Sequence, residues 1–141
     1  MADVFNLLRF VEAQDACGTY ASALAELRAG RKRNHWMWFV FPQIAGLGRS
    51  PTARYYAVSG MAEATAYLAH PVLGPRLVDC ASALTALPAS DATRVLGPVD
   101  ALKLYSSMTL FHRVAPQEPA FAAVLDQYFQ GAEDPGTTSR I

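Results

Sequence analysis

The sequence has little charge. Charged residues make up 17% of its 141 positions, and 12 basic residues balance 12 acidic ones, which leaves a formal net charge of +0 at pH 7. Because no overall field draws such a chain toward nucleic acid or a membrane surface, any electrostatic recognition must be local. We therefore do not expect duplex nucleic acid among its partners. Binding of a single strand through cations and stacking rings is a weaker alternative, because there is just one short basic run.

Long hydrophobic runs are missing as well. The longest apolar run covers residues 36–41, which is far too short to cross a bilayer. The first ten residues, MADVFNLLRF, lack a basic region followed by a leader-like apolar stretch. We therefore expect a cytoplasmic protein that does not contact membranes.

Residue patterns for metals and common cofactors are also absent. Cys17 and Cys80 form neither a disulfide framework nor a metal motif, and His35, His70 and His112 have no second ligand at helical spacing. Neither GxxxxGK nor GxGxxG occurs. These absences predict no metal and no cofactor, and they leave open whether the protein is an enzyme.

Apolar residues, by contrast, are abundant and follow a helical period. They make up 52% of the chain, which is enough to build one buried core in a domain of this length. Spacings of three and four residues, together with Asp, Thr and Ser at helix starts and Gly or Pro at helix ends, predict a series of helices. They cover approximately residues 4–17, 20–29, 61–69, 75–87, 91–96, 100–111 and 121–130.

The fold expected from this pattern is all-α. We predict a compact single-domain bundle of about six or seven short helices over residues 1–131, followed by a polar C-terminal tail over 132–141. Residues 35–44 leave two interpretations open, a short helix or an extended buried segment. A continuous apolar run of this length has no period that would separate the two.

The stretch RKRNHWMWFVFPQIAGLGRSP, residues 31–51, combines cations with aromatic rings, and we call it the basic-aromatic segment. Ser50 followed by Pro51 is typical of a helix start, so backbone N–H groups there could cradle an anion beside Arg49. Cations, flat rings and a helix start together suit a nucleotide or another anionic metabolite. The alternative is a solvated basic loop followed by core aromatics.

A second stretch, VDALKLYSSMTLF at residues 99–111, carries polar residues on an otherwise apolar helix. Asp100, Lys103 and Ser107 stand at i, i+3 and i+7. If Lys103 is buried it must be paired, most simply with Asp100, and we expect that ion pair. Lys103 and the nearby hydroxyls could also help to hold an anion, whereas a serine–lysine catalytic dyad has no supporting motif.

Together these stretches predict one pocket with a cationic rim that binds a small anionic, nucleotide-like ligand. His35, between the cations and the tryptophans, is the first candidate for proton transfer. The alternative function is a protein-interaction or dimerisation module, without catalysis, that uses Trp36, Trp38 and Phe41. The expected ligand-binding residues are Arg31, Lys32, Arg33, His35, Trp36, Trp38, Arg49, Ser50, Asp100, Lys103 and Ser107.

Several blocks of the chain resemble the bacterial domain-of-unknown-function family 1810, sometimes labelled calpastatin-like. They are FVEAQ, ALAELRAGRKRNHWMWFVFPQIAGLGRS, EATAYLAHPVLGPRL, LKLYSSMTLF and YFQGAEDPGTT. The resemblance implies a small, single-domain helical protein and carries no established activity. The calpastatin label has no support in these residues, because a protease-inhibitor repeat would be charged and disordered.

Overall fold

The computed structural model describes residues 2–141, and it confirms the all-α fold class. The segment 16–18 between α1 and α2 is a 3-10 turn, and no helix of the described residues is long and apolar enough to cross a membrane. The helices in chain order are α1 (Leu8–Asp15), α2 (Thr19–Ala29), α3 (Met37–Val40), α4 (Pro51–Tyr55), α5 (Met61–Ala69), α6 (Leu73–Thr85), α7 (Ala92–Leu96), α8 (Pro98–Val114), α9 (Pro119–Phe129) and α10 (Pro135–Thr138).

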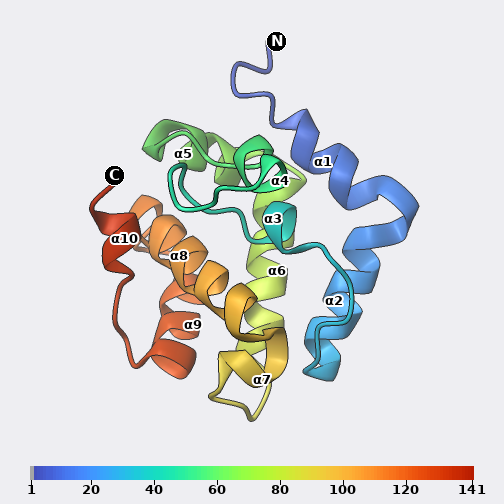
Figure 1. Ribbon diagram of the computed structural model, residues 1–141, viewed down its shortest axis with the longest axis vertical. Helices are drawn as coiled ribbons and strands as arrows, with labels where there is room; N and C mark the ends of the chain where they lie inside the picture. The colour runs from blue at the N-terminus through green and yellow to red at the C-terminus, as the bar shows by residue number, and fades with distance from the viewer. Residues whose placement is uncertain (1) are drawn as a thin grey trace.

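Helix α6 lies at the centre of the molecule, with α2 on one side and α9 on the other, while α8 crosses in front of it (Figure 1). Its apolar stripe, predicted from the helical period, is buried: Leu73, Leu77, Cys80 and Leu84 are each at most 1% exposed. Helix α8 packs against α5, α7 and α9. Two long helices with continuous apolar faces therefore organise one core.

Residues 35–44 combine the two structures that the sequence left open. Residues 37–40 form the short helix α3, and the chain then extends until Ile44 pairs with Val58 in an isolated parallel bridge. The backbone N–H of Val58 donates to the Gln43 carbonyl at 2.9 Å. Pro42 explains the change, because it lacks an N–H and disfavours helical geometry in the preceding Phe41.

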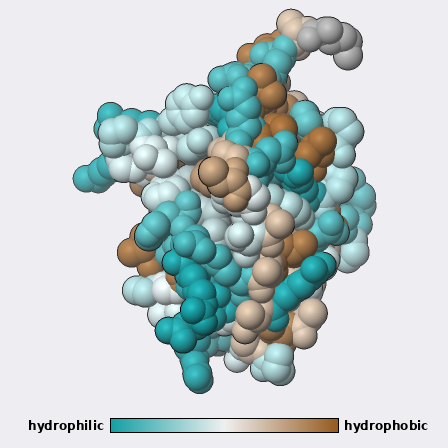
Figure 2. Space-filling model, turned by 90° about the vertical axis from the view of Figure 1, so that its right-hand side faces the viewer, coloured by the Kyte–Doolittle hydropathy of each residue, from teal (hydrophilic) through white to brown (hydrophobic). Residues whose placement is uncertain are grey.

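The first predicted helix is wrong in its start and in its buried face. Helix α1 begins at Leu8, because Asn6 adopts a left-handed backbone (φ 53°) and the Asp3 carboxylate accepts the Leu8 N–H at 2.8 Å. Val4 and Leu8 are 82% and 52% exposed, whereas Phe10 faces the core. Figure 2 shows apolar surface near the N-terminal end of the chain. An apolar period thus does not by itself show which face is buried.

The last ten residues are not the separate polar tail that the sequence predicts. Helix α10 packs against α8, and Thr137 is fully buried. Asp134 caps α10 through the Gly136 N–H (3.1 Å), and its carboxylate also accepts the Ser106 hydroxyl of α8 at 2.6 Å. The chain end is therefore part of the helical domain.

Gly74 permits the close approach of α5 and α6. A Cβ at this position would lie 2.1 Å from the Leu68 carbonyl oxygen, whereas a Cβ at Gly60 would meet nothing within 4 Å. We expect Gly74→Ala to lower the free energy of unfolding by about 3 kcal/mol, because backbone must move to admit the methyl group. Gly60→Ala should cost less than about 1 kcal/mol. Denaturant unfolding followed by tryptophan fluorescence measures both, and equal losses would contradict this role for Gly74.

Candidate functional site

The Glu26 carboxylate holds the start of the basic-aromatic segment. Helix α2 ends at Gly30, whose left-handed backbone (φ 78°) turns the chain back along the helix. The Glu26 carboxylate then accepts the backbone N–H groups of Arg33 (2.6 Å) and Asn34 (3.0 Å) and the Asn34 side-chain amide (2.7 Å). It also accepts the indole N–H of Trp36 at 2.9 Å. Four donors thus fix the path of the segment.

These contacts determine the ionisation of Glu26. Burial acts to raise the pKa of this carboxyl group, but the hydrogen bonds, led by the one from Arg33, outweigh burial and lower the pKa to about 2. The sequence pattern does not predict this contact. The one available signal was an acidic residue in the last turns of a helix, where the helix dipole disfavours a carboxylate unless other donors compensate.

Three charged side chains join the segment to α8. The Asp100 carboxylate lies 2.9 Å from the Lys32 ammonium and 3.3 Å from that of Lys103, so the expected Asp100–Lys103 ion pair is present. Lys32 lies 5.2 Å from the centre of the Trp36 ring, and Lys103 lies 4.8 Å from that of Trp38. The segment and α8 therefore face each other, and two cations share one carboxylate between two indoles.

The aromatic residues of the segment mainly fill the core. Trp36 and Phe41 are 0% and 1% exposed, whereas Trp38 and Phe39 are half-buried. Ser107 of α8 is also fully buried, and its hydroxyl has no hydrogen-bond partner among the described residues. The predicted pocket lined by both indoles and Ser107 is therefore not present in this arrangement.

The remaining predicted residues are distributed over separate parts of the surface. His35 lines a cavity of about 300 Å³ together with Cys17 and the neighbouring Trp36. Arg33 and Arg49 are exposed. Ser50 caps α4 by accepting the Ala53 N–H at 3.1 Å, as predicted, but α4 has only five residues, and its small dipole makes a weak anion cradle.

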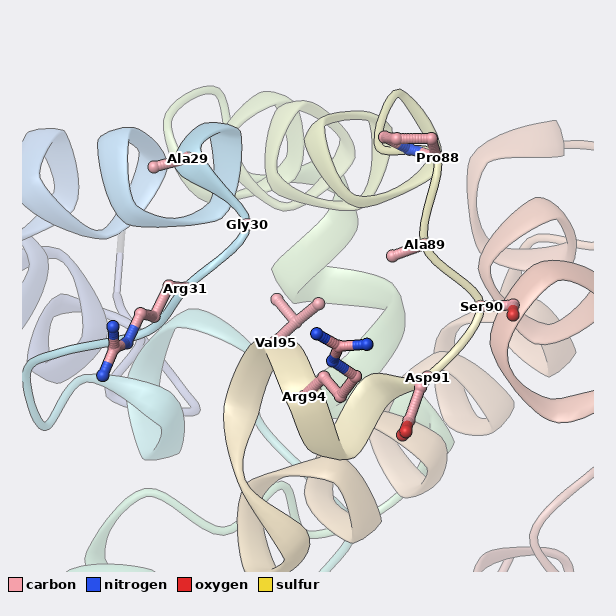
Figure 3. Close-up of a pocket in the computed structure, with 9 residues that line it drawn as sticks. All are labelled: Ala29, Gly30, Arg31, Pro88, Ala89, Ser90, Asp91, Arg94 and Val95. Carbon is pink, nitrogen blue, oxygen red and sulfur yellow. The ribbon is translucent and has the colours of Figure 1, made fainter.

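Arg31 lines a different and larger cleft, which we call the Arg94 cleft. The cleft has a volume of about 850 Å³ and lies between the end of α2 and the start of α7. Figure 3 shows the guanidinium of Arg94 lying over the cleft, whereas the side chain of Arg31 runs away from it. Neither arginine forms an ion pair within residues 2–141. The backbone N–H of Lys32 donates to the Val95 carbonyl at 2.8 Å. This hydrogen bond joins the chain after α2 to α7, on the two sides of the cleft.

Lys103 lines a third cavity, of about 400 Å³, which we call the α8 groove. The groove lies between residues 43–48, α8 and the start of α10. Its lining residues are Gln43, Leu47, Gly48, Val99, Leu102, Lys103, Tyr105, Ser106 and Asp134. In the part of the chain that the structure describes, no group of His, Cys, Asp and Glu side chains is arranged to hold a metal ion.

We expect Glu26→Gln to destabilise the protein by about 2 to 3 kcal/mol near neutral pH, because a neutral amide accepts poorly from four donors. The carboxylate has a pKa of about 2 in the folded protein against an ordinary value of 4.5. Its stabilising contribution is therefore complete above pH 4.5 and is lost as the pH falls toward 2.

Denaturant unfolding across this pH range measures the difference between wild type and Glu26→Gln. Glu12→Gln, which alters an exposed carboxylate, is the matched control and should change stability little. A wild-type advantage that stayed constant down to pH 2 would contradict the assigned role.

We expect Asp100→Asn to lower the free energy of unfolding by about 3 kcal/mol, because it leaves two ammonium groups without their counter-charge. The Lys32 and Asp100 side chains are only 8% and 18% exposed, so solvent screens them weakly. The matched control is Glu133→Gln, whose partner Arg113 has a side chain that is 47% exposed. This control should cost less than about 1 kcal/mol. Thermal and denaturant unfolding compare the two, and a similar cost for both variants would argue against a tight cluster.

Comparisons with known proteins agree with this fold. The model of the family described as "Protein of unknown function (DUF1810)" matches residues 4–141. The chain is also similar to the crystal structure of the conserved hypothetical protein Rv1873 from Mycobacterium tuberculosis, with 50% sequence identity and a TM-score of 0.93 over 97% of this chain and 96% of that one. No curated protein gives a significant match. The chain therefore belongs to the DUF1810 family of proteins of unknown function.

Proposed function

We propose that this protein binds a small anionic ligand in the Arg94 cleft. The observation that carries the proposal is the Arg94 guanidinium, which lies over the cleft without a carboxylate partner among residues 2–141 (Figure 3). A guanidinium presents several N–H donors in a planar fork that matches the oxygens of a phosphate or carboxylate. Asp91 also lines the cleft, but its carboxylate accepts the Thr93 N–H and forms no ion pair with Arg94, so an anion would supply the missing partner.

The other walls of the cleft support a ligand of metabolite size. Its volume of about 850 Å³ lies within the range usual for small-molecule sites. Arg31 is exposed at the edge, and a rotation of its side chain, which runs away from the cleft in Figure 3, would bring a second cation to a bound anion. Ala29, Ala89 and Val95 contribute apolar surface. A ligand with an acidic group and a compact body suits this combination.

The base of a nucleotide finds no ring on which to stack in this cleft. None of its lining residues is aromatic, because Trp36 is buried in the core and Trp38 packs beneath Lys103. The proposal therefore rests on recognition of a phosphate or carboxylate group. A nucleotide would be bound in this cleft through its phosphates alone. His35 lines a different cavity, so the proposal includes no proton transfer.

The alternative that Trp36, Trp38 and Phe41 form an interaction surface finds little support. An interface hot spot needs side chains that a partner can reach, and Trp36 and Phe41 are sealed in the core. Trp38 alone is partly exposed, and the Lys103 ammonium covers its ring. We therefore favour ligand binding over this interface.

The proposal predicts that inorganic phosphate, citrate or AMP raises the melting temperature relative to chloride at equal ionic strength. A ligand at 100 times its Kd adds about 2.7 kcal/mol of stability. Arg94→Ala should abolish this increase and Arg31→Ala should weaken it, because both lose a cation at the cleft. Arg49→Ala should keep the full increase, since Arg49 is exposed and lines a different part of the surface.

Differential scanning fluorimetry, followed by calorimetric titration of the best ligand, gives the measurement. An increase that survives Arg94→Ala would place the anion elsewhere. No increase with any of the three anions would remove the proposed function.

A further inference from the structure

One side-chain amide, that of Gln127 on α9, holds the loop between α6 and α7. Its nitrogen donates to the backbone carbonyl of Leu87 at 2.9 Å and to that of Ala89 at 2.7 Å. A primary amide carries two hydrogens, so these two bonds use both of them. Because residues 88–91 belong to no helix or strand, Gln127 provides a contact that the loop itself lacks.

This loop forms one wall of the Arg94 cleft. Residues 88–91 all line the cleft, whereas Gln127 does not. Helix α9 lies on the side of α6 opposite to α2, and the cleft lies at the end of α2 (Figure 1). The loop therefore separates Gln127 from the cleft, and its carbonyl groups are held on the side away from the cleft.

The peptide group between Ala89 and Ser90 presents its other end to the cleft. In a trans peptide the C=O and the N–H point in opposite directions, and residues 2–141 contain no cis peptide bond. Because the Ala89 carbonyl points to Gln127, the Ser90 N–H points away from Gln127 and toward the cleft. This N–H has no hydrogen-bond partner among the residues that the structure describes.

The side chains of the loop agree with this orientation. Figure 3 shows the Ala89 side chain pointing toward the cleft and the Ser90 side chain running away from it. Ser90 nevertheless lines the cleft, so it does so through its main chain. A backbone donor and the Arg94 guanidinium therefore border the same space.

We propose that the Ser90 N–H donates to the anion bound in the Arg94 cleft, and that Gln127 is the positioning residue that aims it. This inference rests on the proposed function and narrows its ligand class. A guanidinium fork binds two oxygens of an anion. A phosphate group keeps a third oxygen for the backbone N–H, whereas a planar carboxylate has none left. The cleft therefore favours phosphate groups over carboxylates.

Calorimetric titration with inorganic phosphate and with acetate tests this preference, at a temperature where each variant is folded. Gln127→Leu keeps a side chain of similar size but has no donor. It should weaken phosphate binding about tenfold, because the Ser90 N–H is no longer held toward the anion. Acetate binding should change little, so the variant should lose most of the preference for phosphate.

Tyr128→Phe is the matched control, because Tyr128 follows Gln127 on α9 and also contacts the end of α6. Its hydroxyl donates to the Leu84 carbonyl at 2.6 Å, and Leu84 does not line the cleft. This variant should lower the melting temperature but keep the phosphate affinity. A purely structural role for Gln127 predicts the same behaviour in both variants, and equal phosphate affinities in the two would contradict the proposal.

Proton–nitrogen correlation NMR of the wild type observes the donor itself and needs no variant. The Ser90 amide proton should move downfield as phosphate is added, because its N–H then donates to an anion. Phosphate binding that leaves this signal in place would overturn the inference, as would equal phosphate affinity in wild type and Gln127→Leu, and the proposed function would survive either result. A wild type that binds no phosphate, citrate or AMP would overturn both.

Discussion

The arrangement around the candidate site depends on one buried carboxylate, that of Glu26. Its four hydrogen bonds hold residues 33–36 against the end of α2, where the segment would otherwise be free to leave the surface. The indole of Trp36 is thereby drawn into the core. The chain is fixed on both sides of Lys32, so the Lys32 ammonium can reach Asp100 on α8. Two parts of the protein that are far apart in sequence thereby form one charged cluster.

This anchoring gives neighbouring cations different roles. Lys32 points inward and is engaged by Asp100, and Lys103 shares the same carboxylate, so both lysines act mainly in the structure. Arg31, one residue earlier, lies outside the anchored turn and lines the Arg94 cleft instead. Arg94 comes from the short helix α7, whose start is set by the Asp91 cap. The cleft is therefore lined by one cation of the basic run, Arg31, and by one from outside it, Arg94.

Much of the fold could be predicted because it depends on local rules. The α6 stripe, the end of α2 at Gly30, the end of α5 before Pro71 and the Asp91 cap of α7 each depend on a few neighbouring residues. The prediction for the first helix was wrong because it relied on such a local rule alone. Val4 and Leu8 have the right spacing, but spacing cannot show that no partner helix covers them. The fold of the last ten residues depends on Asp134 reaching Ser106, which lies 28 positions earlier in the chain.

The sequence by itself determined the fold class, several helix ends and the two stretches that meet at the charged cluster, because helical period, capping and proline geometry act within a few residues. Only the tertiary structure decided which cations face inward, that Trp36 is core, and that Arg94 rather than Arg49 lies over a cleft. Those outcomes depend on contacts between distant residues. A side chain's exposure and its counter-charge are set by whichever surface the fold brings against it.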